Sequence, residues 1–244
     1  MANFGHGKKY EVIKNKLLHS AAKLFLERGY HNTKIIDITK NAQVDANAVA
    51  RVFGDKDGLM AELVGYVLEG QFESTSKFLK DKTDDKILFY LCETTLQLYM
   101  AESSEHIREL YVVAYSAPKS SNIIYNVITN KLEHIFKEHL PHLETKDFYE
   151  LELASGGIMR SFLSVPCDKY FTMERKIKRF IETTLLVYEV PKSKIEMGIN
   201  FVSQFDFEAL ADITIKNMLN YLKENALRLG EWVWKLKDCY LFYF

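Results

Sequence analysis

Residues 14–59 read KNKLLHSAAKLFLERGYHNTKIIDITKNAQVDANAVARVFGDKDGL. This stretch contains three short helical patterns, which are separated by a glycine and by a very tight turn. The apolar residues of the first pattern recur at helical spacing and predict one buried face: Ile13, Leu17, Ala21, Leu24 and Phe25. Gly29 follows Arg28, and a basic last-turn residue before a glycine ends a helix near residue 28.

The second and third patterns are joined by a turn around Gln43 and Val44. We expect Thr33 to cap the second helix and Asp45 to cap the third, which ends near Phe53. The second helix is predicted to bury Ile38, Ala42 and either Ile35 or Ile36. Two helices joined by so short a turn form a helix-turn-helix, whose second helix can enter a DNA major groove. The stretch therefore predicts a DNA-binding protein.

These residues resemble the DNA-binding module of the tetracycline-repressor (TetR) family of bacterial regulators. The family motifs are matched by Leu24-Phe25, Gly29-Tyr30, Thr33, Ile38-Thr39, Ala42-Gln43-Val44-Asp45, Phe53 and Lys56. The resemblance covers about one fifth of the chain and agrees in spacing and residue type. It implies an all-α fold, in which a helix-turn-helix domain of residues 1–55 precedes a helical effector-binding and dimerisation domain of residues 56–244. A fourth helix joins the two.

Two departures from the family pattern bear on this module. Gln43 stands where the family usually has a glycine in the turn, and a non-glycine residue in that conformation costs about 1 kcal/mol. Ala48 and Ala50 stand where the family often has Thr and Tyr, which donate to phosphate oxygens. We therefore expect weaker DNA binding and a lower salt dependence than in a typical relative.

The remaining polar residues of the module are the candidates for DNA contact. Thr33 and Lys56 are predicted to anchor phosphates from the starts of the second and fourth helices. Asp45 begins the third helix, on which Asn47 and Arg51 are the long or amide-bearing polar side chains. Asn pairs naturally with adenine and Arg with guanine. With so few base-reading side chains, we expect DNA shape to supplement direct readout.

Charge is unevenly distributed along the 244 residues, whose formal net charge is −1. Residues 1–60 carry ten Lys or Arg against six Asp or Glu, and the remainder is acidic. A basic module on an acidic body suits the attraction of DNA to one end of a protein. Within the module, Lys8, Lys9 and Lys14 either reach the DNA or form a solvated basic segment.

The cysteines and the N-terminal residues bear on the cellular compartment. Cys92, Cys167 and Cys239 are odd in number and far apart, so they match neither a disulfide framework nor a zinc site. We expect the first two to be small core residues in a reducing cytosol. The N-terminus lacks the apolar core of a signal peptide, and no apolar run approaches a membrane span. A cytoplasmic protein is therefore predicted.

The chain beyond the module also reads as helical, and its four prolines stand where helical patterns break. Asp55 and Asp206 are predicted helix caps, and Ser193 with Glu196 predicts a capping box. The predicted helices span about 56–80, 84–101, 104–116, 120–139, 146–165, 172–189, 194–203 and 206–229.

The resemblance implies an effector pocket among the fifth to eighth helices. Their apolar walls are rich in Tyr with an occasional Thr, which suits an apolar or aromatic small molecule. Ordinary core packing is the alternative for any single side chain. The candidate pocket residues are Leu88, Cys92, Thr95, Tyr99, Tyr111, Tyr115, Ile124, Ile128 and Phe162.

Helices 146–165 and 172–189 resemble the pair that forms a four-helix dimer bundle in the family. Small residues on the first helix allow close approach, although a seam inside one protomer would have the same composition. The candidate interface residues are Ser155, Gly156, Gly157, Phe180, Thr184 and Tyr188. A two-fold dimer would place two recognition helices about 34–36 Å apart on a near-palindromic operator.

The C-terminal segment EWVWKLKDCYLFYF is rich in aromatic residues. We expect Trp232, Trp234, Tyr240 and Phe242 to pack on the body or across a dimer. A partner-binding tail is the alternative, because exposed aromatic patches are uncommon without a purpose.

Enzymatic activity is not predicted. The sequence has no Gly-rich phosphate loop, nucleophile elbow or Cys–His pattern, and its scattered histidines lack metal-ligand spacing. Neither a cofactor nor a metal site is expected. We predict a ligand-responsive transcriptional repressor, which binds operator DNA and a small effector as a homodimer. The alternative is a regulator that acts through protein partners and has weakened or lost DNA binding.

Overall fold

The computed structural model describes residues 4–227, which form eleven α-helices and, within that range, no strand. The all-α prediction is confirmed. In chain order the helices are α1 (Phe4–Arg28), α2 (Ile35–Asn41), α3 (Ala48–Phe53), α4 (Lys56–Leu79), α5 (Lys86–Glu102), α6 (Glu105–Ala114), α7 (Pro118–Phe136), α8 (Thr145–Ser164), α9 (Met173–Val187), α10 (Lys192–Val202) and α11 (Phe207–Leu227).

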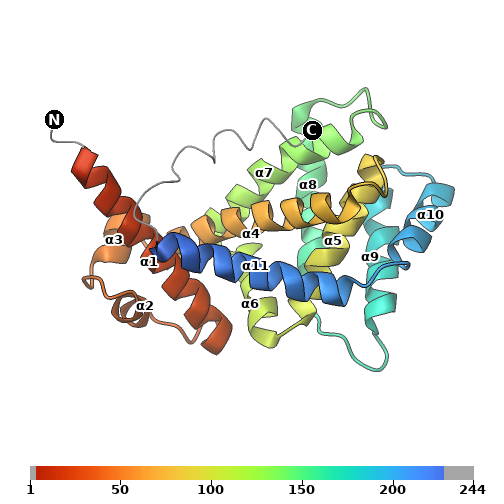
Figure 1. Ribbon diagram of the computed structural model, residues 1–244. Coiled ribbons are helices and arrows are strands. Elements are labelled where there is room, and N and C mark those ends of the chain that lie inside the picture. Colours follow the sequence, from red (N-terminus) through yellow and green to blue (C-terminus); the bar gives the residue numbers. More distant parts are fainter. Residues whose placement is uncertain (1–3, 228–244) are drawn as a thin grey trace.

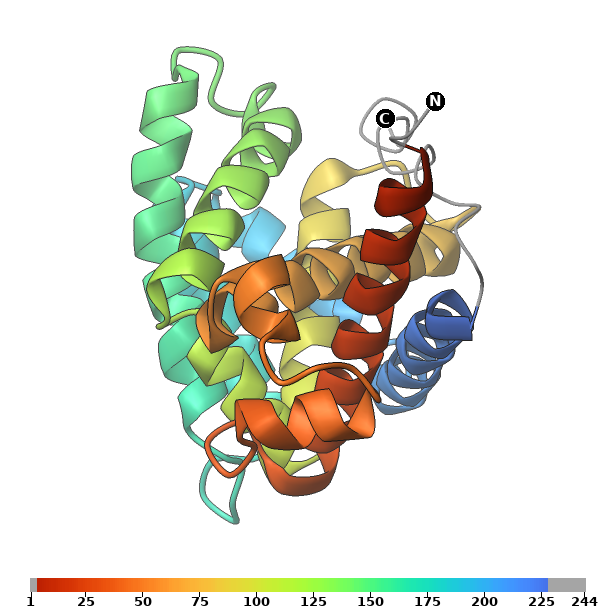
Figure 2. The ribbon, with the colours of Figure 1, turned by 90° about the vertical axis from the view of Figure 1, so that its left-hand side faces the viewer.

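Helices α1, α2 and α3 form one end of the molecule, and the other helices extend from it (Figure 1). Helix α4 runs from this end through the body and packs against α5, α7 and α11. Helix α11 lies beside α4 and returns the chain to α1, so its far end packs against the N-terminal module (Figure 2). The module is therefore held by α4, α6 and α11 together.

The three-helix end is built around a small apolar core. Its buried residues come from all three helices and include Leu17, Leu18, Ala21, Phe25, Ile38, Ala42, Ala48 and Val49. The tight turn before α3 places Gln43 at φ 54°, the left-handed conformation that the sequence predicted there. The backbone strain of this residue costs less free energy than is gained by burying the apolar side chains that the turn brings together.

Several predicted helix starts need correction. Helix α2 begins after Lys34 rather than after Thr33, and α3 begins at Ala48, two residues later than a cap at Asp45 implied. Helix α10 begins at Lys192 after Pro191, so Ser193 and Glu196 lie inside it and form no capping box. The caps of α4 and α11 are confirmed: the Asp55 carboxylate accepts from the Gly58 amide at 2.7 Å, and Asp206 accepts from the Ala209 amide at 3.0 Å.

No described helix is long and apolar enough to cross a bilayer. The predictions for Trp232, Trp234, Tyr240, Phe242 and Cys239 concern residues outside the described range. Cys92 is buried among apolar side chains, as expected, and burial raises the pKa of its thiol to about 12. Cys167 is half-buried.

Candidate DNA interface and effector cavity

The exposed face of α2 and α3 carries the side chains predicted to read DNA bases. Asn47 and Arg51 are both exposed, as that role requires. The Arg51 guanidinium forms a two-point ion pair with the Asp45 carboxylate, with Nη1 and Oδ1 2.7 Å apart. Asp45 also accepts from the Asn47 amide at 3.1 Å. The ion pair with Arg51 lowers the pKa of Asp45, so this carboxylate is charged at the surface that would face phosphates.

The structure places the two predicted phosphate anchors, Thr33 and Lys56, at the turn after α1. Thr33 is 1% exposed, and its hydroxyl donates to the carbonyls of Gly29 at 2.7 Å and Leu24 at 3.3 Å. Its amide donates to the Tyr30 carbonyl, so both of its donors are used inside the module. Lys56 is half-buried with Nζ 2.5 Å from that same carbonyl and 3.9 Å from the centre of the Tyr30 ring. Burial lowers its pKa. Both residues brace the turn after α1. Thr33 has no free donor left, whereas the Lys56 ammonium keeps further N–H donors, so its role as a phosphate anchor stays a prediction.

Other expectations for this face also change. Ile35 and Ile36 are 36% and 42% exposed, whereas one of them was expected to be buried. Ala48 is fully buried, so this position is part of the core. Lys14 forms an ion pair with Glu62 of α4 at 2.5 Å, and therefore does not belong to a free basic segment.

The exposed cations that remain on α2 and its approach are Lys34 and Lys40. Lys9, on the first turns of α1, is also exposed, whereas the Lys8 side chain lies outside what the structure describes. The module thus offers a small set of candidate DNA contacts: Lys34, Lys40, Asn47 and Arg51.

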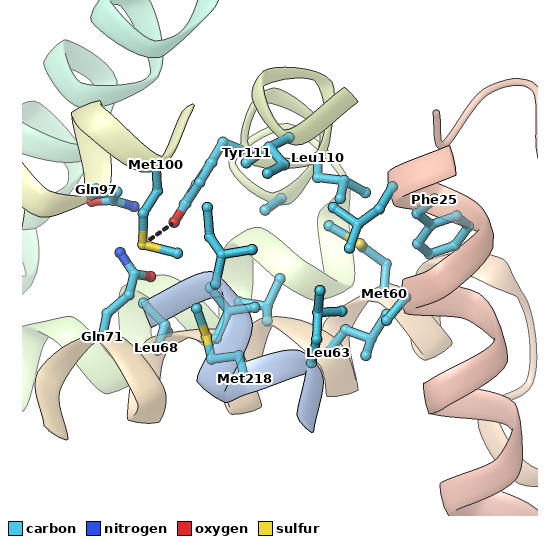
Figure 3. A pocket seen from close by; sticks show the side chains of 18 of the residues that line it. Phe25, Met60, Leu63, Leu68, Gln71, Gln97, Met100, Leu110, Tyr111 and Met218 are labelled. Atoms are coloured by element: carbon cyan, nitrogen blue, oxygen red, sulfur yellow. Dashed lines mark hydrogen bonds between the residues drawn. The ribbon is translucent and has the colours of Figure 1, made fainter. Parts of the chain in front are cut away.

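An apolar cavity of about 120 Å³ lies between the three-helix module and the body. Ala22, Phe25 and Leu26 of α1 form its module side. The other walls come from α4, α5, α6, α7 and α11, whose cavity-lining residues include Met60, Leu63, Leu68, Met100, Leu110, Tyr111, Ile124, Met218 and Leu222. Figure 3 shows Phe25 and Met60 at one end and Gln71, Gln97, Met100 and Tyr111 at the other.

The polar groups of the cavity gather at the end away from the module. Gln97 donates from Nε2 to the Tyr115 hydroxyl at 3.1 Å, and the Tyr111 hydroxyl donates to the Met100 sulfur at 3.6 Å. Gln71 is fully buried, and neither its Nε2 nor its Oε1 has a hydrogen-bond partner in the described part of the chain. All of these side chains are neutral, as is every other residue that lines this cavity.

The structure brings together only part of the predicted pocket. Tyr111, Tyr115 and Ile124 line the cavity, and Ile128 lines a smaller neighbouring one. The other predicted residues pack elsewhere: Leu88 lies near Gly198 of α10, Tyr99 stacks on Phe207 of α11, Phe162 contacts Phe180, and Cys92 and Thr95 are buried outside both cavities. Of the expected fifth to eighth helices, α5, α6 and α7 line the cavity, and α1, α4 and α11 supply its other walls.

The smaller cavity, of about 30 Å³, shares Leu68, Gln97 and Tyr115 with the larger one. It contains two buried carboxyls, and burial raises the pKa of Glu93 to about 7 and that of Glu152 to about 8. Glu152 accepts from the Ser155 hydroxyl at 3.1 Å, and Ser155 accepts in turn from Tyr188 at 2.7 Å. The smaller cavity thus contains a buried polar network and lies beside the apolar cavity.

Helices α6 and α7, which line the cavity, also hold the module. From α6, the Glu109 carboxylate accepts from the backbone amides of Tyr30 at 3.2 Å and His31 at 2.8 Å, and His106 Nδ1 lies 2.8 Å from the Leu26 carbonyl. From the start of α7, Lys119 Nζ lies 2.7 Å from Asp55, and its amide donates to Asp57 at 3.1 Å. The contacts from α6 thus hold the turn after α1, and those from α7 hold the start of α4.

Five of the six predicted dimer residues are interior to one protomer. Phe180, Thr184 and Tyr188 are at most 1% exposed, and Ser155 and Gly156 are also buried. They face the body because their helical positions belong to the core stripes of α8 and α9. Gly157 is exposed, and a side-chain carbon added there would have no heavy atom within 4 Å. The outward face of these helices carries Tyr149, Leu153 and Leu186, which are 39%, 44% and 66% exposed.

Sequence reasoning missed Gln71, although a signal was present. Val64, Leu68, Gln71 and Thr75 recur at helical spacing in α4, and all four are buried. A glutamine on such an apolar stripe indicates a polar group inside the protein. The described residues contain no group of three or more His, Cys, Asp or Glu side chains able to hold a metal ion.

Residues 17–63 match the family model described as "Bacterial regulatory proteins, tetR family". The chain is similar to the probable HTH-type transcriptional regulator YttP of Bacillus subtilis (strain 168), with 24% identity over 160 residues, which cover 64% of this chain and 70% of that protein. It is 26% identical over 113 residues to the HTH-type transcriptional regulator HbdR of Aromatoleum sp. (strain CIB), covering 46% of this chain and 48% of that protein.

Among solved structures, the fold is similar to that of RolR in complex with the ligand resorcinol. The TM-score is 0.64 at 15% sequence identity, and the alignment covers 79% of this chain and 95% of that one. The helical body thus follows a known arrangement as well as the N-terminal module.

Proposed function

Because the chain belongs to the TetR family of helix-turn-helix transcriptional regulators, which bind DNA and are not enzymes, we propose that it is a ligand-responsive repressor. It would bind a near-palindromic operator as a homodimer and change its DNA affinity when a small apolar or aromatic effector binds. Residues 1–55 would hold the DNA, and residues 56–244 would bind the effector and the second protomer.

The observation that carries this proposal is the position of the apolar cavity. Ala22, Phe25 and Leu26 belong to the DNA-binding module, and the opposite walls belong to the body. An effector in the cavity therefore contacts both parts at once. A ligand shifts a conformational equilibrium only by its differential affinity for the two states, commonly about 1–3 kcal/mol of coupling. A site shared by module and body is well suited to produce such a difference.

Two routes can carry a shift from the cavity to the DNA. Helix α4 begins at the module and lines the cavity with Met60, Leu63 and Leu68. Helix α6 lines the cavity with Tyr111 and holds the turn after α1 through Glu109. A movement of either helix would change the direction of α3. The proposed base readers are Asn47, directly before this helix, and Arg51 within it.

Dimerisation would use the outward face of α8 and α9. Tyr149, Leu153 and Leu186 are the exposed apolar residues there, and Gly157 would allow close approach of a second helix. Two modules about 34–36 Å apart would then meet successive major grooves. A single module with two base readers offers little specificity, so two half-sites are needed.

A cavity-filling variant tests the proposal. Ala22→Leu adds apolar atoms at the module side of the cavity and should mimic a bound effector. We expect its affinity for a selected operator, measured by fluorescence anisotropy, to shift by about 1–3 kcal/mol and its response to effector to be lost. Ala209→Leu, at an exposed position of α11, is the matched control. A folded Ala22→Leu protein with unchanged operator affinity and full effector response would contradict the proposal.

A further inference from the structure

Gln71 of α4 is a buried amide whose hydrogen-bonding capacity is unused. It is fully buried, and neither its Nε2 nor its Oε1 has a partner in the described part of the chain. Most buried polar atoms in proteins are hydrogen-bonded, because an unpaired one loses its hydration without compensation. An amide that lacks partners on both of its polar atoms is therefore an exception that calls for a reason.

The position of Gln71 supplies that reason. Its side chain lies at the polar end of the apolar cavity, opposite Met100 and near Gln97 and Tyr111 (Figure 3). Gln97 already donates to Tyr115, and the Tyr111 hydroxyl already donates to a thioether, which is a weak acceptor. Gln71 thus offers its amide N–H donors and its carbonyl oxygen, which is an acceptor, to whatever occupies the cavity.

The lining limits the charge of an occupant. None of the residues that line the cavity is Asp, Glu, Lys, Arg or His. Transfer of a charged group from water into such surroundings without a counter-charge is strongly unfavourable. The occupant must therefore be neutral.

The volume and the walls limit its size and shape. A cavity of about 120 Å³ is slightly smaller than an engineered apolar cavity of about 150 Å³ that holds benzene. Three flexible thioethers, Met60, Met100 and Met218, line it together with Phe25. Methionine side chains adapt to irregular occupants and make favourable contacts with aromatic rings.

We propose that Gln71 determines effector specificity, and that the effector class is a neutral single-ring molecule carrying one hydroxyl group. The hydroxyl would accept from Gln71 Nε2 or donate to Oε1, and the ring would lie among the methionines toward α1. This inference rests on the proposed function, because it names the effector of the same cavity.

Matched probes test the chemistry. Phenol and toluene have the same number of non-hydrogen atoms and differ in the hydroxyl, and cyclohexylammonium is similar in size but charged. Binding to the full-length protein is measured by isothermal titration calorimetry at pH 7, where phenol is neutral. We expect phenol to bind about tenfold or more tightly than toluene, and cyclohexylammonium not to bind.

Gln71→Leu isolates the residue, and Gln204→Leu, at an exposed position of the loop before α11, is its control. Gln71→Leu keeps the size of the side chain and removes two unpaired polar atoms, so its melting temperature should equal or exceed that of the parent. Phenol affinity should fall about tenfold in Gln71→Leu, with toluene affinity unchanged or higher. Gln204→Leu should behave as the parent.

The outcomes separate this inference from the proposed function. Equal binding of phenol and toluene, no phenol binding, preferred binding of cyclohexylammonium, or an unchanged phenol affinity in Gln71→Leu would each overturn the inference. Gln71-dependent phenol binding without any change in operator affinity would support the specificity role and would contradict effector control of DNA binding.

Discussion

At the residue scale, we expect the Asp45–Arg51 ion pair to limit DNA binding, because it occupies the guanidinium of a proposed base reader and adds a carboxylate to the proposed DNA face. Asp45→Asn removes this charge, and its amide oxygen can still accept from the Asn47 amide as the carboxylate does at 3.1 Å. We expect Asp45→Asn to tighten binding to any duplex by roughly threefold to tenfold per protomer, and to steepen the salt dependence.

The measurement is fluorescence anisotropy at several salt concentrations. Asp212→Asn, on the exposed face of α11, makes the same charge change away from the module and should leave affinity nearly unchanged. Arg51→Ala should instead relax preference at one base-pair position of each half-site. If Asp45→Asn and Asp212→Asn bind DNA equally well, the ion pair does not restrain DNA binding.

The buried carboxyl Glu152 predicts a pH dependence of stability. Burial raises its pKa to about 8 in the folded protein from an ordinary value of 4.5, so the folded state holds a proton that the unfolded state loses in this interval. The contribution of Glu152 to the free energy of unfolding is therefore complete below about pH 4.5 and decreases as the pH rises toward 8. Glu152→Gln should remove this fall and raise unfolding free energy at pH 8 by about 1–4 kcal/mol relative to the parent.

Urea denaturation at pH 5 and pH 8 measures this effect for parent and variant. The exposed Glu150→Gln, two residues earlier on α8, serves as the control and should leave the pH dependence of the parent unchanged. A Glu152→Gln variant whose stability relative to the parent is the same at both pH values would show that this carboxyl is ionised in the folded protein throughout.

Individual residues could be predicted from sequence where local geometry decides their role. The positive φ of Gln43 and the capping carboxylates Asp55 and Asp206 follow from turn and cap chemistry within a few residues. The bonds of Thr33 and Lys56 could not, because they go to carbonyls of the turn between α1 and α2, which forms only in three dimensions. A polar residue near a helix start has the same sequence signature in both roles.

At the element scale, α6 is the helix that links cavity and module. Glu109 accepts from two backbone amides of the turn after α1, and a neutral amide would make weaker bonds to them. Glu109→Gln should lower the free energy of opening this turn by about 1–3 kcal/mol. The backbone amides of residues 30 and 31 should then exchange hydrogen faster. Ligand affinity should change little, and ligand-dependent change in operator affinity should decrease.

Glu105→Gln, at an exposed position in the first turn of the same helix, is the control for that variant. Slower or unchanged exchange at residues 30 and 31, together with full coupling in Glu109→Gln, would remove α6 from the transmission route. The connections through α4, α7 and α11 would then remain.

The two glycines inside α4 form a natural pair for comparison. A side-chain carbon added at Gly65 has no heavy atom within 4 Å, whereas one added at Gly70 lies 2.8 Å from Cγ and Sδ of Met218. Gly65→Ala should therefore stabilise the protein by about 0.5–1 kcal/mol without affecting ligand binding. Gly70→Ala should displace Met218 toward the cavity and weaken ligand binding.

Thermal denaturation and calorimetry on both variants test this difference. Equal ligand affinities in Gly65→Ala and Gly70→Ala would show that the close approach of α4 and α11 does not shape the cavity. The existence and order of the helices were predictable from apolar periodicity and breakers, but this approach was not. It joins residues far apart in sequence, and no local pattern indicates which helix will face Gly70.

At the scale of the whole molecule, the cavity illustrates the same limit. Tyr111, Tyr115 and Ile124, which line the cavity, were predicted because the family resemblance implies a pocket among the fifth to eighth helices and the walls there are apolar and rich in Tyr. The walls from α1 and α11 depend on the return of the C-terminal helix to the N-terminal module. Five of the six predicted dimer residues are buried by their own chain for a related reason. Apolar stripes on α8 and α9 show that a face is buried, but not whether a partner or the same chain buries it.

The last prediction concerns the dimer. The exposed face of α8 presents Tyr149, Leu153 and Gly157 at four-residue spacing, so they lie along one side of the helix. A side-chain carbon added at Gly157 has no heavy atom of the protomer within 4 Å, so Gly157→Leu should leave the stability of the protomer intact. Overpacking against a facing helix should weaken the dimer by about 1–3 kcal/mol. Leu153→Glu would place a charge at the same seam, and Met197→Glu, at a 60% exposed position of α10, is the control. Sedimentation velocity over a concentration series should show weaker dimers for the first two variants and parent behaviour for the third. If all three variants and the parent dimerise with equal affinity, the protomers associate through another surface.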